Sequence, residues 1–241
     1  MSQYVALGSS FASGPGLPRG SAYPHLVADR LGLELRDVSR SGATTAHVLR
    51  KRQGRRRPQI SALDGSEELV TVTIAGNDVG MSLRTLIAGL PGWVSGLPVV
   101  RSRVGATFDP TAYEGPLAGV GASLREVAHA IRVRSPRARV VVVDYLTVLP
   151  PSGVPTPPLS SEHADVIRHI AARLRDATAE AAAAEGCILV SAAAASADHH
   201  AWSDEPWTAG AGWPLPRRPV AFHPNASGMR AVADLVVQSL G

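Results

Sequence analysis

Short apolar runs, several of them rich in valine and isoleucine, alternate along the chain with longer segments in which apolar residues recur every three or four positions. The short runs are typical of buried strands, and the longer spacing is typical of helices that pack on a sheet. The expected strands are residues 4–7, 33–38, 69–75, 140–143 and 187–190. The expected helices are residues 23–31, 44–52, 117–135, 160–185 and 226–240.

This alternation of strands and helices favours a parallel sheet covered by helices on both faces. We therefore expect an α/β fold, a three-layer α/β/α sandwich around a central parallel five-stranded sheet. Residues 69–75 are rich in β-branched side chains and should lie centrally. Residues 33–38 alternate apolar and charged side chains and should lie nearer an edge. Sheets of this kind bind ligands beyond the carboxyl ends of their strands.

Residues 1–241 are expected to form a single domain, because this length suffices for one large core and no repeat or linker interrupts it. Three irregular stretches are too long for plain connections, and we expect them to form the substrate pocket. These stretches are residues 78–116, 147–158 and 192–222. They hold the four tryptophans, Trp93, Trp202, Trp207 and Trp213.

The charge pattern narrows the possible partners. The net charge is only +4, and Lys51 is the only lysine in a chain whose other basic residues are arginines. The basic cluster at residues 50–57 is either a patch for phosphate or an anionic surface, or a solvated loop after a helix. We favour the solvated loop, since no aromatic residues interleave with the charges. No nucleic-acid partner is expected.

Metal binding, disulfides and targeting signals are not indicated. Cys187 is the only cysteine, so it has no partner within the chain. The His199-His200 pair is a weak metal site, because adjacent side chains diverge, and we expect no metal. Residues 1–7 have neither a basic start nor a long apolar stretch. We therefore expect no signal peptide, no membrane span and a cytoplasmic location.

Two residues fit nucleophilic catalysis. Ser10 follows the first expected strand and enters a glycine-rich turn, where a hydroxyl can attack a substrate if a base lies nearby. Ser9 is its rival, because neighbours along a strand point in opposite directions. His223 precedes Pro224 at the start of the last helix and can accept the serine proton. Taken singly, an ordinary strand-end serine and a capping or surface histidine are the simpler interpretations.

Two further residues can stabilise an oxyanion. Gly42 lies before a helix start, where its N–H can face a developing negative charge. Asn77 ends the most strongly β-branched strand, and its side-chain amide is a suitable donor. Each could instead be an ordinary turn residue. Asp78 is expected to hydrogen-bond the turn rather than transfer protons.

Together these residues resemble the SGNH hydrolases, the GDSL-type lipases and esterases, whose Ser, Gly, Asn and His correspond to Ser10, Gly42, Asn77 and His223. The family's Gly-Asp-Ser block reads Gly8-Ser9-Ser10 here, and its Gly-x-Asn-Asp block is matched in its ending by Gly76-Asn77-Asp78, in shortened form. The resemblance spans residues 4–240. It implies a flavodoxin-like sandwich and ester hydrolysis through an acyl-serine intermediate, without metal or cofactor.

The family's last block, Asp-x-x-His, has Val220 in place of the acid. Some members of the family use a backbone carbonyl there, which gives a Ser-His dyad. This chain resembles that type, so we expect the Val220 carbonyl to orient His223. Asp198 and Asp204 in the preceding loop are possible substitutes for the acid.

The sequence therefore predicts a serine esterase that acts on a small-molecule carboxylic ester. Two alternatives stay open. One is a carbohydrate or natural-product O-deacetylase, because tryptophans of the 192–222 loop could stack on sugar rings. The other is a non-catalytic binding module on the same fold.

Overall fold

The computed structural model describes residues 3–81, 84, 87, 105–212 and 218–241. Its strands form one parallel sheet in the order β2-β1-β3-β4-β5, which confirms the expected three-layer α/β/α sandwich. The strands are β1 (Gln3–Gly8), β2 (Glu34–Asp37), β3 (Glu67–Thr73), β4 (Arg139–Val143) and β5 (Ile188–Val190). Much of the 78–116 stretch lies outside the described residues, as do Trp93 and Trp213.

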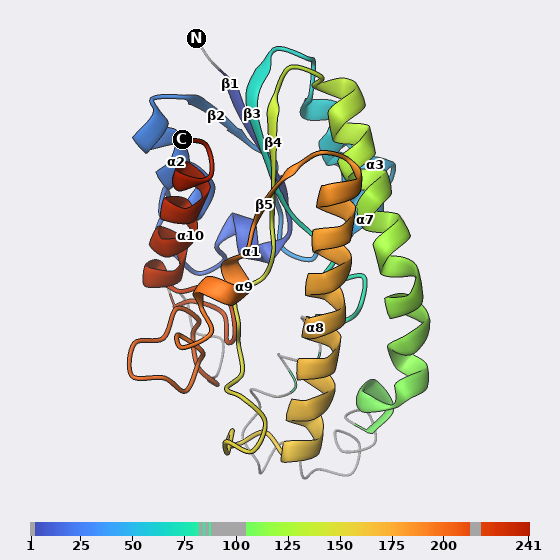
Figure 1. The fold of residues 1–241 in the computed structure, drawn as a ribbon, viewed down its shortest axis with the longest axis vertical. Helices are drawn as coiled ribbons and strands as arrows, with labels where there is room; N and C mark the ends of the chain where they lie inside the picture. The colour runs from blue at the N-terminus through green and yellow to red at the C-terminus, as the bar shows by residue number, and fades with distance from the viewer. Residues whose placement is uncertain (1–2, 82–83, 85–86, 88–104, 213–217) are drawn as a thin grey trace.

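Helices cover both faces of the sheet (Figure 1). One face carries α2 (Tyr23–Leu31) and α10 (Ala226–Gln238), and the other carries α3 (Thr45–Leu49), α7 (Glu114–Arg134) and α8 (Ser161–Ala184). The short elements are α1 (Ser10–Ser13), α9 (Ala192–Ala195), η1 (Gln59–Ala62) and η2 (Pro110–Ala112). The ten expected elements are all present with somewhat different ends, whereas the four short ones were not expected, because a single turn carries no periodic signal.

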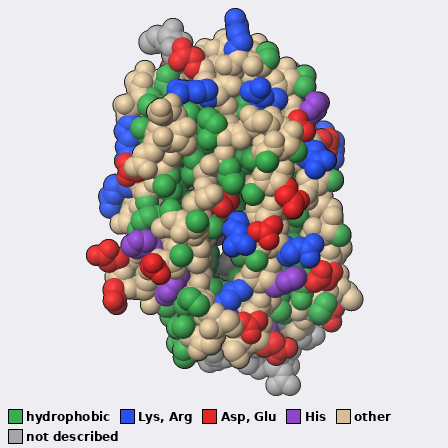
Figure 2. Space-filling view, in the orientation of Figure 1, with side chains coloured by type: hydrophobic (Ala, Val, Ile, Leu, Met, Phe, Trp, Pro, Cys, Tyr) green, Lys and Arg blue, Asp and Glu red, His purple; other side chains and the backbone are tan. Residues whose placement is uncertain are grey.

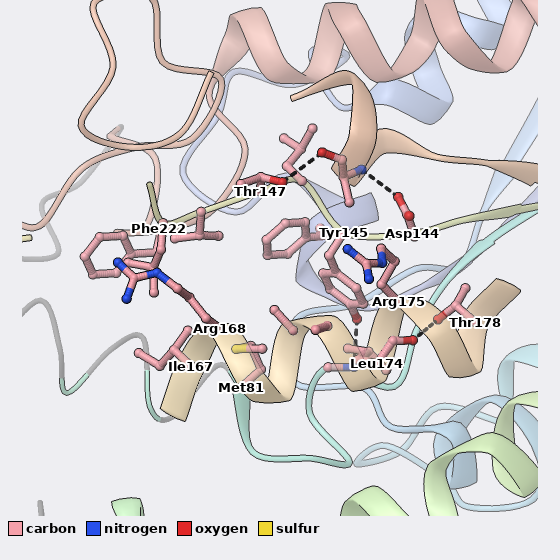
Figure 3. A pocket seen from close by; sticks show the side chains of 18 residues that line it. Met81, Asp144, Tyr145, Thr147, Ile167, Arg168, Leu174, Arg175, Thr178 and Phe222 are labelled. Atoms are coloured by element: carbon pink, nitrogen blue, oxygen red, sulfur yellow. Dashed lines mark hydrogen bonds between the residues drawn. The ribbon is translucent and has the colours of Figure 1, made fainter. Parts of the chain in front are cut away.

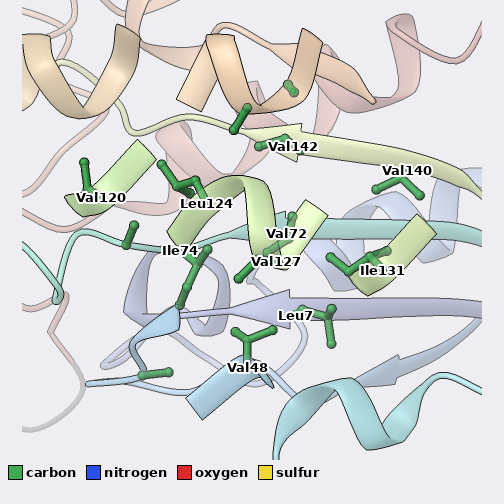
Figure 4. Packing of buried hydrophobic residues seen from close by; sticks show 14 of the residues in the cluster. Leu7, Val48, Val72, Ile74, Val120, Leu124, Val127, Ile131, Val140 and Val142 are labelled. Atoms are coloured by element: carbon green, nitrogen blue, oxygen red, sulfur yellow. The ribbon is translucent and has the colours of Figure 1, made fainter. Parts of the chain in front are cut away.

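Successive side chains of each strand point alternately to the two faces of the sheet, as a parallel sheet buried on both sides requires. Val5 and Leu7 of β1 pack toward α3, α7 and α8, while Tyr4 and Ala6 pack toward α2 and α10. Figure 4 shows the first of these cores, in which Val72 and Val142 of the sheet meet apolar side chains of α7. The apolar residues that recur along α7 are thus the ones that pack on the sheet.

A smaller apolar cluster lies beyond the carboxyl ends of the strands. It joins Phe108 and Leu159 to Ile167 of α8 and to Phe222. Helix α8 runs well past the sheet at this end (Figure 1), so its first turns support loops rather than strands. This cluster fixes Phe222, the residue just before His223.

The site region lies where the chain changes direction across the sheet. From β1 the chain moves outward to the edge strand β2, and then returns past β1 to β3. The segments after β1 and β3 therefore diverge to opposite faces and leave a crevice between them, which is the usual ligand site of doubly wound sheets. Ser10 follows β1 and Asn77 follows β3.

Gly8, the last residue of β1, should not tolerate a side chain. Its φ is +146°, and a Cβ there would lie 2.6 Å from the carbonyl oxygen of Thr73. Gly8→Ala should lower the free energy of unfolding by about 3 kcal/mol, from backbone strain and the clash together. Gly32→Ala is the matched control, because Gly32 also has a positive φ but no atom within 4 Å of the added Cβ. It should cost only about 1 kcal/mol.

Urea unfolding followed by circular dichroism measures both changes. Equal losses for the two variants would show that the close approach of Gly8 to β3 contributes nothing.

Candidate active site

Ser10 and His223 are in direct contact although 213 positions separate them. The Oγ of Ser10 lies 2.9 Å from Nε2 of His223. Ser10 is the first residue of α1 and is 4 % exposed, and His223 is 6 % exposed. The pair is therefore shielded from water but not sealed. Ser9, the rival nucleophile, does not contact His223 and faces Tyr145 instead.

The carbonyl that holds the imidazole belongs to Ala221, which corrects the assignment to Val220. Nδ1 of His223 lies 3.0 Å from the Ala221 oxygen, whereas the Val220 oxygen accepts the main-chain N–H of His223 at 3.1 Å. The reason is the left-handed backbone of Phe222, with a φ of +58°. The Val220 carbonyl closes this turn, and the Ala221 carbonyl turns toward the ring.

This contact determines the tautomer. A carbonyl oxygen only accepts, so Nδ1 carries a hydrogen and Nε2 is left to accept the proton of the Ser10 hydroxyl. Burial lowers the pKa of His223 below its usual 6.5, and the bond to Ala221 opposes this shift only in part. The imidazole is therefore neutral near pH 7, as a base must be.

No carboxylate replaces the missing acid in the described part of the chain. Both ring nitrogens of His223 are engaged by Ser10 and Ala221. Asp198 and Asp204, the possible substitutes, are exposed and make no contact with the ring.

The turns of Gly42 and Asn77 are brought together. Nδ2 of Asn77 donates to the Ala43 carbonyl at 2.7 Å, and the Asp78 carboxylate accepts from the main-chain N–H and the hydroxyl of Thr45. Asp78 thus hydrogen-bonds a turn, as expected, and ties the start of α3 to the end of β3. Gly42 is exposed and has a φ of +76°. Its turn also reaches α1, where Ser41 Oγ lies 3.5 Å from Ser13 Oγ.

Tyr145 links the nucleophile turn to the Asn77 turn, and sequence reasoning missed it. Its hydroxyl accepts the Gly76 N–H at 2.9 Å and lies 3.2 Å from Ser9 Oγ. Burial raises the pKa of Tyr145 to about 12, so the hydroxyl keeps its proton and can donate to Ser9. Ser9, where the family has aspartate, is therefore linked to the Gly76 N–H through the Tyr145 hydroxyl. The place of Tyr145 just after the β4 apolar run was the only available signal.

Two non-glycine residues with left-handed backbones stand directly before the site segments. They are Phe222, before His223, and Ala75, with a φ of +84°, before Gly76. Such conformations cost about 1–3 kcal/mol each and persist where the surroundings impose them. Ala75 stands where the Gly-x-Asn-Asp block has its first glycine, so this block has full length here, with alanine replacing glycine.

An apolar cavity of about 190 Å³ adjoins the pair. Phe11, Gly76 and Phe222 line it, and each is the chain neighbour of Ser10, Asn77 or His223. The cavity follows α8, with Phe222 and Ile167 toward one end and Asp144 and Thr178 toward the other (Figure 3). In the space-filling view, hydrophobic and charged side chains meet at a hollow on the face that carries α8 (Figure 2).

Two features were sought in the described ranges, a cluster of metal ligands and a membrane-spanning helix. No three His, Cys, Asp or Glu side chains lie together there in a way that could hold a metal ion. None of the helices described has an apolar stretch long enough to cross a bilayer.

Comparison with known proteins decides the family. The model of the GDSL-like Lipase/Acylhydrolase family matches residues 6–231. The chain belongs to this family. It is 33 % identical to Lipase 2 of Streptomyces coelicolor, over 99 % of this chain and 85 % of that protein. Membership confirms the resemblance drawn from the four motifs, and with it a serine carboxylic-ester hydrolase.

Two solved structures of lipid-hydrolysing enzymes have the same fold. An extracellular lipase from Streptomyces rimosus superposes with a TM-score of 0.76 at 26 % identity, covering 99 % of this chain and 100 % of that one. A phospholipase A1 from Streptomyces albidoflavus NA297 gives a TM-score of 0.75 at 25 % identity, with 99 % of both chains covered. This chain therefore shares its fold with a lipase and with a phospholipase.

The lowered pKa of His223 can be measured directly. NMR titration of the folded protein, with the signal assigned by comparison with His223→Gln, should give a pKa below 6.5. The unfolded chain binds the proton more readily, so the free energy of unfolding should fall as the pH drops below about 6.5 toward the folded pKa. A folded pKa at or above 6.5 would show that the ring is hydrated or faces a carboxylate.

Proposed function

We propose that Ser10 and His223 form a catalytic dyad that hydrolyses carboxylic esters. His223 takes the hydroxyl proton as Ser10 attacks the acyl carbon, and then gives it to the departing alcohol. Water, activated by the same imidazole, releases the acid from the acyl-serine. The observation that carries this proposal is the 2.9 Å contact of Nε2 with Oγ, in a tautomer imposed by Ala221.

The oxyanion formed at each step would be held by three donors. These are the main-chain N–H groups of Ser10 and Gly42 and the side-chain amide of Asn77. Asn77 uses one Nδ2 hydrogen on Ala43, which fixes the amide plane and leaves the second hydrogen for substrate. The links of Asp78 and Tyr145 to these turns support the donors before substrate arrives.

The acyl group of the substrate is proposed to lie in the cavity along α8. The lining residues of that helix run from Ile167 to Thr178, which is roughly 16 Å of helix. This length and the apolar walls suit an alkyl chain of several carbons better than an acetyl group. Phe11 and Phe222 lie beside the dyad and also line the cavity, so they would contact the alkyl chain of the substrate between Ser10 and the cavity.

The two tryptophans of the 192–222 loop that the structure describes, Trp202 and Trp207, give little support to sugar stacking. Trp202 stacks on Phe222 and donates its indole N–H to Pro157, and Trp207 stacks on His199 at 4.2 Å between ring centres. Trp202 thus packs against the residue before His223, and Trp207 packs within the loop itself. The activated serine also argues against a non-catalytic module. We therefore place the acyl esterase ahead of a deacetylase or binding protein.

The cellular location stays a prediction. The S. rimosus relative is described as extracellular, and export of this protein would follow if the similarity extends to location.

Ser10→Ala should abolish ester hydrolysis without unfolding the protein, because the acyl intermediate then has no oxygen to form on. Ser9→Ala should keep activity within about a hundredfold of the parent, since only the bridge to Tyr145 is lost. Turnover of a nitrophenyl ester and labelling with a fluorophosphonate probe measure both. An inactive Ser9→Ala beside an active Ser10→Ala would exchange the two roles.

Asn77→Ala should lower kcat by roughly 10²–10³-fold with little effect on KM, as loss of one oxyanion donor does. Asn77→Asp tests the same amide with nearly unchanged volume and should also lose kcat. If only KM rises, the side chain holds ground-state substrate and is not an oxyanion donor.

Ala171→Phe should place a ring in the middle of the cavity wall formed by α8. We expect kcat/KM for a decanoyl ester to fall by about tenfold or more relative to an acetyl ester, because the long chain loses its space. Ala183→Phe, exposed on the same helix outside the cavity, is the control and should leave this ratio unchanged. A constant ratio in both variants would place the acyl chain elsewhere.

A further inference from the structure

Positive charge is concentrated in one segment of this chain. Residues 36–57 hold eight of the 24 basic residues and a single acidic one, Asp37, which gives this segment a net charge of +7. The rest of the chain has 16 basic and 19 acidic residues and thus a net charge of −3. The overall charge of +4 conceals a basic region on an otherwise acidic molecule.

Folding gathers this charge around a hollow of about 450 Å³ at the β2 edge of the sheet. Four arginines line it. Arg36 and Arg40 come from β2 and the residues after it, and Arg56 and Arg57 come from the segment before η1. The sequence suggested a solvated loop at residues 50–57 alone. The structure adds the guanidinium groups of Arg36 and Arg40, from β2 and the residues after it, and the loop becomes one wall of a concave site.

Two acids lie near the arginines of the hollow, since Asp37 attracts Arg40 and Asp64 attracts Arg36. No ion pair joins any of the four arginines to a carboxylate among the described residues. Asp37 is engaged by the His25 ring at 3.6 Å and by the Ser39 N–H. Arg40 is partly buried, and burial together with the charge of Arg56 lowers its pKa, although Asp37 opposes this shift. The protein therefore holds like charges together against both desolvation and repulsion.

We propose that this hollow binds a phosphate group. Arginine presents a planar fork of donors that matches phosphate oxygens in pairs, and several such forks around one concavity suit a tetrahedral anion. A bound phosphate would offset the repulsion between the guanidinium groups and accept their free N–H bonds. The group could be free phosphate or the headgroup of an anionic lipid, since both offer the same oxygens.

The hollow is joined to the nucleophile strand. Gln59 lines the hollow. Its side-chain amide accepts the Gly8 N–H at 2.8 Å and donates to the Gly8 carbonyl at 2.9 Å. The main-chain N–H of Arg40 donates to the same carbonyl. Gly8 lies two residues before Ser10. A phosphate on these arginines would therefore be held by segments that also position the catalytic turn. Binding itself does not depend on the proposed ester hydrolysis.

Binding should be measured in a Ser10→Ala background, so that no ester is consumed. The test variant is Arg40→Gln/Arg56→Gln/Arg57→Gln, which leaves every main-chain contact in place. Its control is Arg125→Gln/Arg134→Gln/Arg173→Gln, which removes the same charge from exposed sites on α7 and α8. Calorimetry with inorganic phosphate and cosedimentation with phosphatidylcholine vesicles, with and without phosphatidic acid, are run at about 0.15 M ionic strength.

Saturable binding of phosphate, or of the phosphatidic acid vesicles, should weaken about tenfold or more in the test variant and change by less than about twofold in the control. Binding in the phosphate arm identifies a free anion, and binding in the vesicle arm alone identifies a lipid headgroup. Equal weakening in both variants would reduce the effect to net charge and overturn the proposal. The proposal would also be overturned if neither phosphate nor the vesicles bound saturably, or if a single-stranded oligonucleotide, titrated in the same calorimeter, were the only ligand to bind.

Discussion

The parallel pairing of β1 with β3 determines where the chemistry of this protein lies. Six residues of β1 pair with β3 up to Gly8 and Thr73, and the next N–H, that of Ser9, still bonds Thr73. The two strands end together, so the segments that carry Ser10 and Asn77 leave the sheet side by side. A shift of one residue in this pairing would reverse the directions of Ser9 and Ser10. The Gly8 clamp by Gln59 holds this alignment from the other side.

Ser10 and His223 come from opposite ends of the chain. Both side chains are nearly inaccessible to water, and the proposed chemistry depends on this. His223 is delivered by the loop before α10, which packs on α2 close behind β1 (Figure 1). Among the described residues its ring meets a carbonyl dipole and no carboxylate, so in the proposed dyad the imidazolium would be less stabilised than in a triad. The fixed dipoles of the proposed oxyanion hole would compensate in part, because they need not reorganise during the reaction.

Sequence reasoning identified the elements and the four motif positions because each motif directly follows a strand or precedes a helix. It failed where the answer depends on a backbone angle or a distant contact. The Ala221 carbonyl could not be separated from that of Val220 without the φ of Phe222. Tyr145 carries no motif, and its role depends on reaching Ser9, 136 positions earlier. The arginine hollow likewise combines segments that are separate in the sequence.

The carbonyl that orients His223 has a consequence for how this enzyme tolerates mutation. A triad acid can be deleted by a single codon change, but a main-chain oxygen is present whatever side chain stands at position 221. The weak point moves to position 222, where the backbone must stay left-handed. β-Branched residues avoid that region, whereas asparagine and glycine enter it readily. Position 221 should therefore accept any small side chain that fits its buried place, whereas position 222 should be restricted by its backbone, with selection acting on backbone shape in place of charge.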